Sequence, residues 1–109
     1  MAEKLVRDRV PELYGTTPND PTYRIAEPSE MFGLLIQKLR EETEELARSR
    51  DPAELADVVE VAKALTKEIG LTQQAIEAVR RSKFEQAGAF SAKIVWCNAP
   101  DRPLPPDNP

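Results

Sequence analysis

The chain has 109 residues, of which 40% are hydrophobic and 31% are charged, as expected for one small helix-rich domain. Its net charge of -4 argues against nonspecific binding to nucleic acid, so an anionic substrate needs a metal ion or a local basic cluster to approach. The chain contains no histidine, which excludes histidine bases, Ser–His and Cys–His catalysis, and histidine-ligated zinc.

Cysteine content and hydropathy predict the compartment. The single cysteine, Cys97, cannot form an internal disulfide, which favours a reducing environment. No stretch approaches the roughly 18 apolar residues of a membrane span, and residues 1–10 lack the apolar region of a signal peptide. We therefore expect a soluble cytoplasmic protein without a membrane partner.

Proline and glycine residues mark the ends of the expected elements. A short first helix is followed by a loop over residues 14–29, which contains three prolines. The helical spacing of apolar residues predicts a helix from roughly Glu30 to Ser49. Asp51 as N-cap and Pro52 at the first helical position begin a second helix, which runs to about Ile69.

A third helix is expected after Thr72, running toward Gly88, and residues 90–96 could form a strand-like arm. Five prolines in residues 98–109 predict a Pro-rich tail that cannot join a packed core. We therefore expect an all-α fold: a small helical bundle over residues 1–97, with a short N-terminal helix and three main helices. Because these helices have broad apolar faces, a homodimer is expected to complete the bundle.

Acidic residues lie on both sides of the turn near Arg50. Glu42 falls within the apolar stripe of the helix before the turn, at a position where leucine is expected. If the two helices pack as antiparallel neighbours, Glu45 is level with Glu54, and Glu42 is level with Asp57.

Four carboxylates in one groove repel each other unless a cation lies between them. Mg²⁺ suits such a site because it takes oxygen ligands and binds through a few carboxylates plus substrate phosphates, and Mn²⁺ is also possible. The alternative is that E-E-x-x-E arises by chance on a solvated helix face.

Basic residues near the N-terminus are candidates for binding phosphate. Lys4, Arg7 and Arg9 form a basic run that suits a triphosphate, although Arg7 and Asp8 could simply cap or pair within the first helix. Lys38 lies one turn from Glu42, where it is expected to balance charge, and we count it with the candidate substrate-binding residues.

Four segments resemble, in order and spacing, the MazG-like all-α nucleoside triphosphate pyrophosphohydrolases, and within them the phosphoribosyl-ATP pyrophosphohydrolase-like subgroup. These segments are EKLVRDRVPELY (3–14), LLIQKLREETEEL (34–46), AELADVVEVAKAL (53–65) and RRSKFEQAGAF (80–90). The resemblance spans roughly residues 3–95. E-E-x-x-E followed by E-x-x-D is the metal-binding signature of that family.

The resemblance implies an activity and a set of site residues. Glu42, Glu45, Glu54 and Asp57 would be the Mg²⁺ ligands, Glu41 would position a metal or the attacking water, and Lys83 would bind phosphate. Members of the family convert a nucleoside triphosphate to the monophosphate and pyrophosphate, usually as a housecleaning activity. They form dimers or tetramers with sites beside subunit contacts.

The chain departs from the subgroup's K-x-x-x-R-G-G-F motif at two positions, where Ala87 replaces the arginine and Ala89 replaces the second glycine. A phosphate contact present in relatives would be lost with that arginine. Two alternatives to Mg²⁺-dependent nucleoside triphosphate hydrolysis therefore stay open. One is phosphoribosyl-ATP pyrophosphohydrolase, and the other is a catalytically silent helical oligomer that binds nucleotide or a protein partner.

Overall fold

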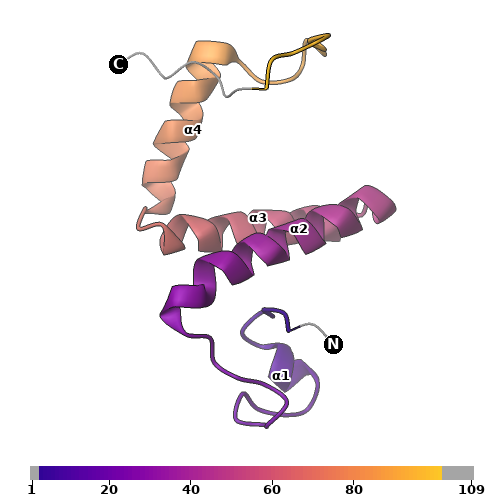
Figure 1. The fold of residues 1–109 in the computed structure, drawn as a ribbon, viewed down its shortest axis with the longest axis vertical. Coiled ribbons are helices and arrows are strands. Elements are labelled where there is room, and N and C mark those ends of the chain that lie inside the picture. Colours follow the sequence, from indigo (N-terminus) through magenta and orange to yellow (C-terminus); the bar gives the residue numbers. More distant parts are fainter. Residues whose placement is uncertain (1–2, 102–109) are drawn as a thin grey trace. The chain divides into compact units, whose positions relative to one another are not determined.

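The computed structural model describes residues 3–101, and these residues form an all-helical structure (Figure 1). The elements are α1 (Val10–Leu13), a 3₁₀ turn (Pro28–Glu30), α2 (Met31–Ser49), α3 (Pro52–Glu68) and α4 (Gln73–Ala87). The all-α prediction is confirmed, and α2, α3 and α4 begin and end within a residue of the expected positions. None of the described helices is long and apolar enough to cross a membrane.

The expected strand-like arm at 90–96 is wrong, because these residues lie in a turn and irregular backbone, and the described residues contain no strand with which it could pair. The expected Pro-rich tail lies largely outside the described residues, which end at 101. The chain divides into two compact units, one ending at Leu71 and one beginning at Thr72. Each unit is described by itself.

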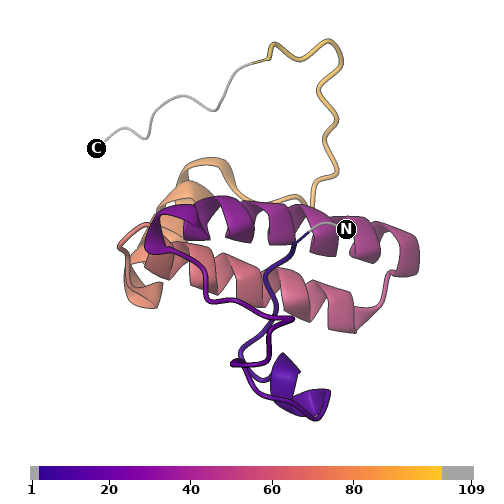
Figure 2. The same ribbon diagram turned by 60° about the horizontal axis from the view of Figure 1, so that its bottom comes forward.

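In the first unit, α2 and α3 pack side by side in opposite directions (Figure 2). The reversal takes only two residues. Arg50 adopts a left-handed conformation with φ of 54°, and its backbone N–H donates to Leu46 O at 2.8 Å. The Asp51 side chain accepts a 2.9 Å hydrogen bond from the Ala53 N–H and thereby caps α3, as the sequence predicts.

The interface between these helices is small and partly polar. Among the described residues, Leu35 and Val61 are the buried hydrophobic side chains, and Glu42 and Thr66 are the buried polar ones. Thr66 donates its hydroxyl proton to Ala62 O, which satisfies it within its own helix. Glu42 also has a partner within its own helix, because Lys38 Nζ lies 3.3 Å from its Oε1, so the centre of the interface holds a charged pair.

The second unit consists of α4 and the residues that follow it. Thr72 caps α4 by accepting a 3.0 Å hydrogen bond from the Ala75 N–H, and the helix ends at Gly88, whose φ is 77°. Lys83 is an exposed residue of α4. Its expected contact with phosphate therefore stays a prediction within this unit.

Candidate metal centre

Three of the four predicted metal ligands converge across the α2–α3 interface. Glu42 comes from the middle of α2, and Glu54 and Asp57 come from the first two turns of α3. One carboxylate oxygen from each lies within 4.8 Å of the others. The tight turn at Arg50 and Asp51 sets the helix register that brings them together.

Glu45, the fourth predicted ligand, is oriented differently. Its Oε1 accepts a 2.8 Å hydrogen bond from Arg48 Nη2, one turn further along α2. Its charge still acts on Glu54. The structure therefore groups three carboxylates, with Glu45 engaged beside them.

Within this cluster, burial and the proximity of the other carboxylates change the pKa of Glu54. Partial burial, followed by the hydrogen bond and charge of Glu42 and then the charge of Asp57, raises the pKa of the Glu54 carboxyl above its ordinary value. The cluster thus resists full ionisation in the absence of a cation. A cation placed between these oxygens reverses that effect.

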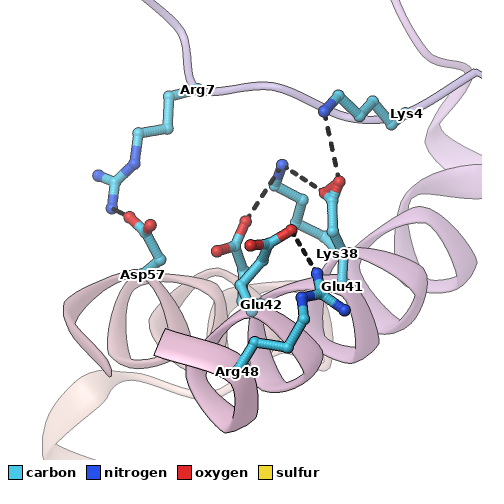
Figure 3. Close-up of polar contacts among 8 residues, drawn as sticks. Lys4, Arg7, Lys38, Glu41, Glu42, Arg48 and Asp57 are labelled. Carbon is cyan, nitrogen blue, oxygen red and sulfur yellow. Dashed lines mark hydrogen bonds and ion pairs between the residues drawn. The ribbon is translucent and has the colours of Figure 1, made fainter. Parts of the chain in front are cut away.

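Basic side chains contact two of the three carboxylates, those of Glu42 and Asp57 (Figure 3). Lys38 Nζ donates a 2.9 Å hydrogen bond to Glu41 and lies 3.3 Å from Glu42 Oε1. From the N-terminal segment, Lys4 reaches Glu41 at 3.4 Å, and Arg7 Nη2 donates a 2.6 Å hydrogen bond to Asp57 Oδ1.

These contacts assign different properties to Glu41 and Lys38. The hydrogen bond from Lys38 is the main cause that lowers the pKa of Glu41, so Glu41 is a weaker base than an ordinary glutamate. Burial alone lowers the pKa of Lys38, but hydrogen bonds and charges from Glu41 and Glu42 outweigh it, and the net pKa of Lys38 is raised. Lys38 is therefore a persistent cation beside the cluster.

An open groove of about 750 Å³ runs beside the carboxylates. The N-terminal segment from Lys4 to Val10 and Tyr14 form part of its lining, and α2 and α3 form the rest, with Glu42 and Asp57 among the lining residues. Lys38 and Arg7 line the same space. The groove therefore brings carboxylates and cationic groups to one surface, with room for a ligand.

The chemistry of the donor set fits a hard divalent cation. Mg²⁺ takes oxygen ligands at about 2.1 Å, so opposite ligand oxygens are roughly 4.2 Å apart. One oxygen from each of the three carboxylates lies within 4.8 Å of the others, a limit that includes this separation. Glu42, Glu54 and Asp57 are the residues that would hold such an ion.

The pairing of Arg7 with Asp57 could not be read from the sequence. The two residues are fifty positions apart, and the sequence offered phosphate binding or a pair with Asp8 for Arg7. Arg9, the third member of the basic run and the N-cap residue of α1, pairs with Glu12 of that helix at 2.9 Å. The one sequence feature that pointed to a role for Arg7 is the run of three basic residues in an acidic chain.

Comparisons of the chain with models of protein families, with curated proteins and with solved structures find no match.

Proposed function

We propose that this protein is a Mg²⁺-dependent nucleoside triphosphate pyrophosphohydrolase of the MazG-like type. The observation that carries the proposal is the convergence of Glu42, Glu54 and Asp57 beside a groove that is also lined by Arg7 and Lys38. Carboxylates suit the metal, and the basic groups suit the phosphates. The resemblance of the four sequence segments supplies the substrate class.

In the proposed reaction, water attacks a phosphorus of the α–β anhydride, the bridging P–O bond breaks, and nucleoside monophosphate and pyrophosphate leave. Mg²⁺, when bound, supplies charge neutralisation and polarises the phosphate oxygens. Lys4, Arg7 and Lys38 bind the phosphate oxygens and stabilise the leaving pyrophosphate. Glu41, held between Lys38 and Lys4, orients the attacking water, a role that does not require strong basicity.

The test is pyrophosphate release from a panel of nucleoside triphosphates and phosphoribosyl-ATP in the presence of Mg²⁺. Wild type is compared with Glu42→Gln and Asp57→Asn, and with Glu44→Gln, an exposed glutamate of α2, as the matched control. We expect Glu42→Gln and Asp57→Asn to lose on the order of 100-fold or more in rate, because the metal's contribution to the transition state is several kcal/mol. Equal release by all four proteins contradicts the proposal.

A binding role without turnover is the second candidate. It is favoured by the ion pairs that already neutralise Asp57 and Glu42 within the chain, and by Ala87 at the position where the subgroup has arginine. In that case Mg²⁺ with a nucleotide raises the melting temperature, and the same panel yields no pyrophosphate.

A homodimer or homotetramer is part of the proposal. Few apolar side chains are buried in the first unit, whereas Leu55 and Val59 of α3 and its C-cap residue Ile69 are about half exposed, at 52%, 49% and 55%. Their helical spacing places them on one face of α3, and Ala62 lies between them. A second copy of the chain packing on this face would build the four-helix bundle that the pair α2–α3 lacks.

A further inference from the structure

The N-terminal segment places a cationic group on a carboxylate of the candidate metal centre. Arg7 lies outside the regular helices, and its guanidinium reaches Asp57 on α3 across a sequence separation of fifty residues. The 2.6 Å contact is short, and Figure 3 shows the Arg7 side chain directed toward the Asp57 carboxylate. Arg7 therefore supplies positive charge to a carboxylate that is assigned to the metal.

This ion pair is suited to exchange. The side chains of Arg7 and Asp57 are 56% and 34% exposed, and exposed ion pairs contribute little net stability. The guanidinium can bind a phosphate in the same two-pronged way as a carboxylate. Since Arg7 also lines the groove, phosphate oxygens entering there come within its reach.

We propose that Arg7 is an exchangeable internal counter-cation: it competes with the divalent cation for Asp57 and moves to the phosphates once the metal is bound. The inference rests on the proposed function and adds an order to it. Metal binding in the absence of phosphate is opposed by Arg7, and binding of phosphate in the presence of metal is strengthened by Arg7. The metal–triphosphate complex is thereby favoured over the free metal as the ligand.

Lys38 does not share this role. It comes from α2 itself, its side chain is only 17% exposed, and it contacts both Glu41 and Glu42. Such a group stays in place as part of the helix surface. Arg9 is the suitable control, since it lines the same groove and carries the same charge, but its ion pair is with Glu12.

The experiment measures two affinities on wild type, Arg7→Gln and Arg9→Gln. The first is the affinity for Mn²⁺ alone, followed by electron paramagnetic resonance. The second is the affinity for inorganic tripolyphosphate in saturating Mn²⁺, followed by calorimetry, which avoids any dependence on the base. Circular dichroism verifies that the variants keep the helical content of wild type.

We expect Arg7→Gln to bind Mn²⁺ alone more tightly by on the order of tenfold, and Mn²⁺–tripolyphosphate more weakly by a similar factor. Arg9→Gln should change each by less than about threefold, because exposed charges are screened by salt. The opposite signs distinguish exchange from a purely structural contact and from a simple phosphate contact.

Equal Mn²⁺ affinity of wild type and Arg7→Gln, or an equal gain in both variants, would overturn the competition. Equal binding of Mn²⁺–tripolyphosphate by wild type and Arg7→Gln would overturn the transfer to phosphate. If none of the three proteins binds Mn²⁺, both this inference and the proposed function fail. A failure confined to Arg7→Gln leaves the proposed function intact.

Discussion

Lys38 Nζ lies 3.3 Å from Glu42 Oε1, one turn apart on α2, and both side chains are largely withdrawn from solvent, at 17% and 10% exposure. The contact explains how a carboxylate is tolerated at the centre of an apolar stripe. A buried charge is costly unless it is paired, and here the partner comes from the same helix. The same lysine also holds Glu41, so one ammonium group balances two glutamates.

Replacing Lys38 by glutamine should therefore destabilise the metal-free protein. The variant leaves Glu42 buried without a positive partner, at a cost of about 1–3 kcal/mol in the free energy of unfolding. Urea denaturation monitored by circular dichroism measures it. Arg48→Gln is the control, because the Arg48–Glu45 pair is exposed and its loss should cost less than about 1 kcal/mol. Equal losses in the two variants contradict the assignment.

Replacing Glu54 by glutamine should instead stabilise the metal-free protein. Burial and the charges of Glu42 and Asp57 raise the pKa of Glu54, so its ionised form at neutral pH disfavours the folded state without metal. Glu54→Gln removes this repulsion, and we expect its melting temperature at pH 7 to exceed that of wild type.

When Mg²⁺ is added, the melting temperature of wild type should exceed that of Glu54→Gln. Wild type keeps a ligand that the variant lacks and therefore gains more stability from binding the ion. Differential scanning fluorimetry with and without Mg²⁺ tests both expectations on the same samples. Glu44→Gln, which removes an exposed charge elsewhere on α2, should follow wild type in both conditions. A variant stabilised by Mg²⁺ as much as wild type would show that Glu54 is not a ligand.

Local rules were enough to predict the helices and the acidic cluster. Asp51 and Pro52 define the start of α3, and the short turn then sets Glu42 opposite Asp57 by the rise per residue alone. The start of α3 depends only on residues within one turn, and the register of Glu42 and Asp57 depends only on the antiparallel packing of adjacent helices. Such relationships are visible in a single sequence.

The long-range ion pairs could not be predicted in this way. The contacts of Arg7 with Asp57 and of Lys4 with Glu41 depend on the path of the irregular backbone before α2. Glu45, a predicted metal ligand, forms an ion pair with Arg48, three residues further on the same helix. Side-chain choice between two nearby partners of similar energy is not fixed by helix register.

Residues 3–30 offer a test of this irregular segment that is independent of any metal. Arg24 donates hydrogen bonds to both Glu3 and Glu30, at 2.7–3.1 Å. The hydrogen bond from Arg24, followed by that from the Glu27 N–H, lowers the pKa of Glu30 to about 2. Arg24 therefore connects the N-terminal segment to the start of α2.

The sign of the pH dependence follows from this shift. A carboxyl whose folded pKa lies below its unfolded value stabilises the fold above the unfolded pKa, and this contribution is lost as the pH falls toward the folded pKa. Glu30→Gln should thus be less stable than wild type at pH 7, and the difference should shrink between the ordinary value of 4.5 and about 2. Urea midpoints at several pH values measure it. A difference that is constant with pH contradicts the ion pair.

The exposed apolar face of α3 leads to a prediction about assembly. Val59 lies between Leu55 and Ala62 on that face and is about half exposed in the single chain. A lysine at this position keeps the helix but places a charge where the second copy is proposed to pack, and burying an unpaired charge is strongly unfavourable. Val59→Lys should therefore shift the protein from dimer to monomer in size-exclusion chromatography with light scattering. Ala53→Lys introduces the same charge at an exposed alanine of α3, about 120° around the helix from Val59, and should leave the assembly unchanged. If wild type is already a monomer at high concentration, or if both variants dissociate alike, this face is not the interface.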